Sequence, residues 1–202
     1  GRAVTVPTLY AAKRLVQLSS NVAMERMGVE IYKILISDFP GNGIRFLKEI
    51  GLLDILIPEL VATVGCTQNK YHLHDVFEHT LSVLDGISKH SVHARAAALF
   101  HDIGKPRCKT IKEDGECQFL GHEDVSEEIC KEVLARLKFS SYFTEKVSTL
   151  VKEHMRSIQS GKKGIRRLIK DLEYTHYCLD SWLELKEADL FGFVKDQLGL
   201  SY

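Results

Sequence analysis

Histidine and aspartate residues recur at positions that face the apolar side of helical segments. His79 lies three residues after Val76, and His101 lies four residues after Ala97. Residues three or four apart share one face of a helix, so both imidazoles should point toward the core. Asp102 is adjacent to His101, about a third of the way round the helix. These side chains have the chemistry of metal ligands.

Three more inward-facing candidates come later in the chain. His122 opens a segment with an apolar stripe of its own, His154 lies four residues after Leu150, and Asp189 lies four residues after Leu185. The combined set offers nitrogen and carboxylate oxygen without sulfur. Such ligands suit Mn, Fe, Ni, Co, Zn or Mg and argue against a structural zinc knot.

The ordinary explanation of a buried polar residue has to be weighed against the metal. A single buried histidine is most often a core residue with a satisfied hydrogen bond, whereas a single buried carboxylate is rare because its burial is costly. If each case had its own explanation, buried polar side chains from five helices would each need a separate partner. One shared divalent cation would satisfy all of them. A divalent cation can also make water more acidic and screen the charge of a phosphate.

Helices dominate the elements that must position these residues. We predict helices at about 8–20, 22–37, 43–50, 75–89, 92–103, 122–138, 142–155, 163–173 and 176–191. Residues 52–64 continue the apolar pattern through Pro58, which either begins a short helix or breaks one. Asp75 is the predicted N-cap of its helix. Residues 110–119 contain Asp114-Gly115, a typical hairpin turn. The fold class is therefore all-α with one short β-hairpin.

Composition limits the class of protein. The 202 residues include 27 basic and 27 acidic side chains, which indicates no global attraction to nucleic acid or membrane but leaves local patches open. The five cysteines form no C-x-x-C pair, which excludes a zinc ribbon and indicates a reducing compartment. No apolar run approaches the ~20 residues that cross a bilayer. We expect a cytoplasmic protein without membrane contact. The initial Gly1 leaves open whether the chain is a piece of a longer protein.

The segment 99–105 contains the adjacent pair His101-Asp102 and resembles the central motif of the HD phosphohydrolase superfamily. His79 upstream and Asp189 downstream complete the H…HD…D pattern in the expected order. The resemblance implies an HD-domain helical bundle in which these four residues chelate one metal ion.

Longer stretches resemble the neck and HD portion of bacterial tRNA nucleotidyltransferases and poly(A)-polymerase-like proteins. They are residues 25–60, 71–80, 119–123, 166–169 and 187–189, within a resemblance that covers about 10–195. Some HD branches add two histidines before the last aspartate. His122 and His154 stand there, so the resemblance leaves a second metal possible, with Asp102 as the bridge.

The same resemblance divides the chain into a neck-like N-terminal helical annex, residues 1–65, and an HD metal-binding domain, residues 66–202, expected to form one compact unit. The related enzymes carry a nucleotidyltransferase head with paired acidic residues. This sequence contains no such segment, so we expect that it does not add nucleotides.

The implied activity is hydrolysis by metal-activated water of phosphomonoesters or (cyclic) phosphodiesters of nucleotides or RNA ends. Asp102 would act at the metal. Lys105 would neutralise phosphate charge, or it is only a cation at a helix C-terminus. If one metal binds, His122 and His154 would instead contact the phosphate or protonate the leaving group. Arg166, in a basic run, would contact substrate or RNA, or simply face solvent.

A second hypothesis is a non-catalytic RNA- or protein-binding module derived from a tRNA nucleotidyltransferase that lacks its head. The six intact ligand positions favour the enzyme, because a scaffold does not need a costly buried cluster. The sequence predicts no oligomeric state.

Overall fold

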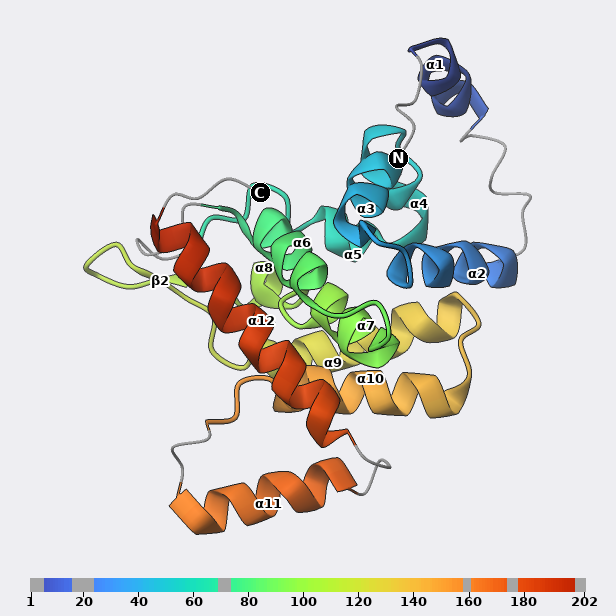
Figure 1. Ribbon diagram of the computed structural model, residues 1–202. Coiled ribbons are helices and arrows are strands. Elements are labelled where there is room, and N and C mark those ends of the chain that lie inside the picture. Colours follow the sequence, from blue (N-terminus) through green and yellow to red (C-terminus); the bar gives the residue numbers. More distant parts are fainter. Residues whose placement is uncertain (1–5, 16–23, 69–73, 158–160, 174–177, 199–202) are drawn as a thin grey trace.

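The computed structural model describes residues 6–15, 24–68, 74–157, 161–173 and 178–198. The described chain is helical apart from one hairpin (Figure 1). Its helices are α1 (Val6–Leu15), α2 (Met24–Leu35), α3 (Pro40–Glu49), α4 (Leu53–Leu56), α5 (Pro58–Val61), α6 (Val76–Gly86), α7 (Val92–Phe100), α8 (Lys105–Cys108), α9 (His122–Arg136), α10 (Ser141–Glu153), α11 (Gly161–Glu173) and α12 (Leu179–Leu198). The all-α prediction is confirmed. No helix in the described ranges is both long and apolar enough to span a bilayer.

The predicted hairpin is also present. β1 (Thr110–Ile111) and β2 (Cys117–Gln118) pair antiparallel, with Thr110 opposite Gln118. The turn between them places Gly115 at φ +82°, a left-handed conformation that glycine adopts without steric cost.

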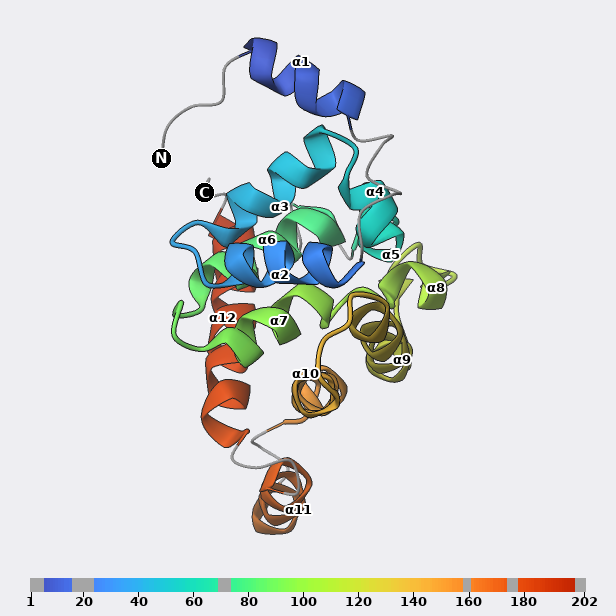
Figure 2. The same ribbon diagram turned by 90° about the vertical axis from the view of Figure 1, so that its right-hand side faces the viewer.

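Helix α7 lies at the centre of the bundle. It packs against α6, α9, α10 and α12. Its four alanines between Ala94 and Ala98 are fully buried, and their small side chains let the neighbouring helices approach closely. Figures 1 and 2 show α12 on one side of α7 and the α9–α10 pair on the other. Residues far apart in sequence therefore meet around the C-terminal end of α7.

The helices α2 to α5 attach to the bundle through buried polar contacts. The Arg95 side chain on α7 is 4% exposed, and it donates hydrogen bonds of 2.6 Å to the carbonyl oxygens of Leu35 and Ser37. The amide of Gly41 donates to a carboxylate oxygen of Asp85 at 2.7 Å. A buried charge whose donors are satisfied in this way fixes the orientation of α2 and α3 on α6 and α7.

Local sequence explains the starts of α6, α5 and α3. The Asp75 side chain accepts a hydrogen bond from the Glu78 amide at 2.8 Å, so the predicted N-cap of α6 is confirmed. Pro58 begins α5 directly after α4, so it both breaks the apolar segment and starts a new helix. Pro40 begins α3 three residues earlier than predicted, because proline fits the first position of a helix.

Several predicted helix ends were wrong. Helix α6 ends at Gly86 instead of about residue 89, and α12 runs on to Leu198 instead of 191. Helix α7 ends at Phe100 instead of residue 103, because the bonds from Ile103 to Phe100 and from Lys105 to Asp102 span three residues and tighten the chain into turns. The unpredicted α8 follows at once. Residues 16–20, 22–23 and 176–177 of the predicted helices lie outside the described residues.

Candidate metal centre

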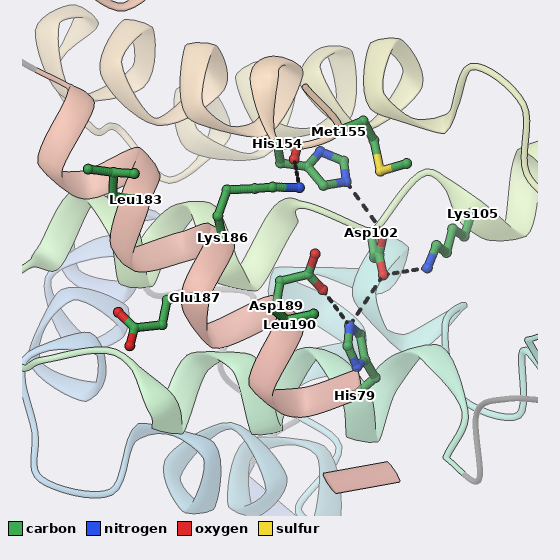
Figure 3. Close-up of a pocket in the computed structure, with 10 residues that line it drawn as sticks. All are labelled: His79, Asp102, Lys105, His154, Met155, Leu183, Lys186, Glu187, Asp189 and Leu190. Carbon is green, nitrogen blue, oxygen red and sulfur yellow. Dashed lines mark hydrogen bonds and ion pairs between the residues drawn. The ribbon is translucent and has the colours of Figure 1, made fainter. Parts of the chain in front are cut away.

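Six side chains converge beside the C-terminal end of α7. They are His79 from α6, His101 and Asp102 from the turn after α7, His122 from the start of α9, His154 from the end of α10, and Asp189 from α12. Five of them are at most 5% exposed, and the Asp189 side chain is 27% exposed. Four of the six, His79, Asp102, His154 and Asp189, line a pocket of about 690 Å³ whose lining side chains are drawn in Figure 3. The fold thus gathers every residue expected as a metal ligand.

Asp102 lies between two groups of ligands. Its Oδ2 atom is 3.2 Å from His101 Nε2 and 3.8 Å from His79 Nε2. Its Oδ1 atom is 3.3 Å from His122 Nε2 and 3.8 Å from His154 Nε2. One carboxylate therefore turns one oxygen toward each group.

Asp189 completes the first group. Its Oδ1 atom lies 3.1 Å from His79 Nε2 and 3.8 Å from His101 Nε2, across the interface between α12 and α6. The first group is then two imidazoles and a carboxylate, with Asp102 shared with the second group.

Three of the histidines are oriented by the backbone. Each directs its Nδ1 atom at the carbonyl oxygen three residues earlier: His101 at Ala98 (2.8 Å), His122 at Phe119 (2.8 Å) and His154 at Val151 (2.6 Å). A carbonyl oxygen only accepts, so Nδ1 must carry a proton and donate it. A neutral ring in this tautomer presents the Nε2 lone pair to the cluster, which is the arrangement typical of metal-bound histidine.

The cluster has an excess of acceptors. The Nε2 atoms of His122 and His154 are 3.2 Å apart, and both carry lone pairs in the tautomers fixed by the backbone. The buried Nε2 atom of His101 has no hydrogen-bond partner among the described residues. Facing lone pairs and carboxylate oxygens repel one another unless a positive charge lies among them. The donor set therefore fits a divalent cation.

Burial and charge set the protonation of the cluster. Burial alone would raise the pKa of Asp102, but the positive charges of His101 and Lys105 hold it well below its usual range. Burial lowers the pKa of His154 to about 3, so that ring is neutral. Burial also opposes a charge on His101, yet Asp102 raises its pKa overall. A proton and a metal ion would therefore compete for the Nε2 lone pair of His101.

Two lysines line the pocket. Lys105 Nζ donates to Asp102 Oδ2 at 2.6 Å and to Gln68 Oε1 at 2.7 Å. Lys186 Nζ donates to the His154 carbonyl at 2.7 Å. Lys105 was predicted from the sequence and Lys186 was not, although Lys186 lies three residues before Asp189 and so shares its helix face.

The exposed residues that line the pocket are three apolar side chains and Glu187. Met155, Leu183 and Leu190 line it with side chains that are 54%, 44% and 64% exposed (Figure 3). Arg166 is exposed on α11 and is not among the residues that line this pocket, so its contact with substrate stays a prediction.

Two family profiles match the chain. Residues 76–188 match the profile described as HD domain, and residues 4–63 match the profile described as probable RNA and SrmB-binding site of polymerase A.

Curated relatives match about three quarters of the chain. A CC-adding tRNA nucleotidyltransferase from Thermus thermophilus is 37% identical in an alignment of 164 positions that covers 75% of this chain and 38% of that protein. An A-adding tRNA nucleotidyltransferase from Deinococcus radiodurans is 36% identical over 73% of this chain and 35% of its own length. A multifunctional CCA protein from Paracidovorax citrulli is 30% identical over 77% of this chain and 37% of its own length. The matched part of this chain thus corresponds to little more than a third of each relative.

Proposed function

Because this chain belongs to the HD domain family, we propose that it is a metal-dependent phosphohydrolase acting on phosphomonoesters or (cyclic) phosphodiesters of nucleotides or RNA ends. The observation that carries the proposal is the position of Asp102, with Oδ2 facing His101 and Oδ1 facing His122 at 3.2 and 3.3 Å. A buried carboxylate that only stabilised the fold would not require oriented imidazoles beside both of its oxygens.

His79, His101, Asp102 and Asp189 would hold one divalent ion, and Asp102, His122 and His154 would hold a second if two bind. A bound divalent ion supplies positive charge that stabilises a phosphate in the transition state and makes water more acidic. The nitrogen and oxygen ligands suit Mn, Fe, Ni, Co, Zn or Mg.

The chain's own cations would receive the phosphate. Lys105 Nζ lies 2.6 Å from Asp102, close enough to reach a phosphate oxygen beside that carboxylate. Its charge would offset negative charge that develops on the phosphate during the reaction. If only one metal binds, His122 is free to contact the phosphate through Nε2, and it would protonate the leaving group as an imidazolium, since its Nδ1 proton is donated to the Phe119 carbonyl.

The pocket mouth fits the remainder of a nucleotide. Met155, Leu183 and Leu190 offer apolar surface on the solvent side of the ligand cluster. A base or ribose can lie against such surface while the phosphate reaches the polar floor. A pocket with apolar walls and a few polar groups is typical of small-molecule sites, and it supports a nucleotide or RNA end over inorganic phosphate.

The test measures metal content and turnover on the same protein. The chain is purified without chelator, its metals are quantified by mass spectrometry, and it is assayed on bis-p-nitrophenyl phosphate, 2′,3′-cyclic nucleotides and nucleoside monophosphates with Mn, Ni, Fe or Mg. Asp102→Asn should abolish hydrolysis and reduce bound metal. Asp54→Asn, at an exposed position of α4, is the matched control and should change neither. No metal and no turnover with any of these ions would refute the proposal.

The runner-up is a non-catalytic RNA- or protein-binding module. It is supported by the match of residues 4–63 to a profile described as RNA-binding, and by relatives whose names are those of tRNA nucleotidyltransferases. A chain that binds RNA but neither binds metal nor hydrolyses any of these substrates would establish this alternative.

A further inference from the structure

Helix α11 concentrates positive charge on its exposed side. Five basic residues with exposed side chains lie between Gly161 and Asp171: Lys162, Lys163, Arg166, Arg167 and Lys170. No acidic residue occurs in that interval. The whole chain has equal numbers of basic and acidic residues, so this is a local concentration and not a reflection of net charge. We call these five side chains the basic face of α11.

The opposite side of α11 is already in use. Leu168 is 4% exposed and Leu172 is fully buried, and the helix packs against α10 and α12. An amphipathic basic helix inserts its apolar side into a lipid surface, but here that side is buried in the protein. Only the basic face is free to meet a partner.

Arg156 connects α11 to the end of α10. Arg156 pairs with Glu153 at the end of α10 (2.6 Å) and with Asp171 on α11 (3.2 Å). Met155, which lines the pocket mouth, immediately precedes Arg156. These ion pairs tie α11 to the segment that forms the pocket rim.

The partner must be a polyanion with repeated charges. From Lys162 to Lys170 the basic face extends about 12 Å along the helix, long enough for more than one phosphate of a nucleic acid strand. Arginine and lysine both bind phosphate oxygens well. No large apolar side chain is exposed between Gly161 and Leu172, so the face lacks the anchors with which protein partners are usually bound.

We propose that the basic face of α11 binds the phosphate backbone of RNA. The surface is separate from residues 4–63, the part of the chain that matches an RNA-binding profile, because α1 to α5 lie at the opposite end of the molecule (Figures 1 and 2). The proposal does not depend on hydrolysis: a chain without phosphohydrolase activity would still bind RNA here.

The experiment compares two triple variants with the same net charge. One is Lys163→Gln/Arg166→Gln/Arg167→Gln on α11, and the control is Lys112→Gln/Lys131→Gln/Lys138→Gln at exposed positions elsewhere. Fluorescence anisotropy measures binding of a labelled RNA of about 20 nucleotides over a range of salt concentrations. Circular dichroism confirms that each variant is folded.

The α11 variant should bind at least roughly tenfold more weakly than the wild type, and the slope of log K against log salt should fall by about 2 if three phosphate contacts are lost. The control should stay near the wild type. Equal losses in the two variants, no loss in either, or no RNA binding by the wild type would overturn the proposal. Binding of poly-glutamate that is lost only in the α11 variant, with RNA binding retained, would instead assign the face to an acidic protein.

Discussion

The Nε2 atoms of His122 and His154 face each other at 3.2 Å while both rings direct Nδ1 at backbone carbonyl oxygens. Neither Nε2 atom can donate to the other in these tautomers, so the contact is unfavourable without a shared positive charge. His154 cannot supply that charge readily, since burial lowers its pKa to about 3. The relationship predicts that metal binding stabilises the fold.

Metal should therefore raise the melting temperature of chelator-treated protein. Mn²⁺ at about 100 times its Kd adds about 2.7 kcal/mol to the free energy of unfolding, and this corresponds to roughly 5–10 °C for a chain of this size. Differential scanning calorimetry with and without Mn²⁺ measures the shift. His122→Gln/His154→Gln should show a smaller shift than the wild type. An equal shift in that variant would place the stabilising ion elsewhere.

Lys186 should contribute to substrate binding. Its Nζ atom is fixed 2.7 Å from the His154 carbonyl and lines the pocket, so its charge is available to an incoming phosphate. Lys186→Met should raise KM about tenfold with a smaller change in kcat, because the contact is made with the bound substrate as well as in the transition state. Steady-state kinetics on a phosphodiester test this. The exposed Lys131→Met on α9 is the control. A loss of bound metal with unchanged KM would show that Lys186 acts only by positioning His154.

Periodicity predicted which residues would meet. His79 and Asp189 were predicted to face the core from their spacing to apolar residues. They are 110 residues apart in the chain, and the structure places His79 Nε2 3.1 Å from Asp189 Oδ1, between α6 and α12. That success has a physical basis, since a helix has one buried side and polar residues on it must end in the core. The all-α class follows from the same pattern.

Local turns and tertiary contacts could not be predicted in this way. His101 and Asp102 were expected inside a helix, but α7 ends at Phe100 and they lie in a turn. The turn depends on close packing with α9, which no local pattern shows. Gln68 was missed for a similar reason: it is buried and accepts a hydrogen bond from Lys105, although the two are 37 residues apart.

Gly104 should be essential to that turn. A Cβ atom at this position would lie 2.8 Å from the His122 carbonyl oxygen and 2.8 Å from the Ser126 amide. Both contacts are backbone atoms that cannot rotate away, so Gly104→Ala must push the turn off α9 and should cost about 1–3 kcal/mol. Because the turn carries Asp102, metal affinity should also fall.

The control for Gly104 is Gly86→Ala, where the new Cβ would meet the Ala188 Cβ at an ordinary 3.5 Å. Urea unfolding and metal titration on both variants provide the comparison. Comparable stability of the two variants would mean that the turn after α7 tolerates a side chain, and the close approach to α9 would then have no role in forming the site.

A bidentate ion pair joins α5 to α9. The Arg136 guanidinium donates to the two carboxylate oxygens of Glu59 at 2.9 and 2.7 Å. Burial alone would raise the pKa of Glu59, but the hydrogen bonds from Arg136 hold it below its ordinary value of 4.5. The Glu59 side chain is 14% exposed and the Arg136 side chain 34%, so solvent screens the ion pair only in part.

Stability should therefore depend on Glu59 in a defined pH range. A carboxyl group whose pKa is lower in the folded state stabilises the fold above its unfolded pKa of about 4.5, and this contribution is lost as pH falls through the lower folded value. Glu59→Gln should reduce the free energy of unfolding by about 1 kcal/mol near pH 7, and the difference from wild type should shrink toward zero near pH 3. Urea unfolding at both pH values measures it, with the exposed Glu128→Gln on α9 as the control. A difference that persists unchanged at the lower pH would show that Glu59 stabilises the α5–α9 contact by packing and not through its charge.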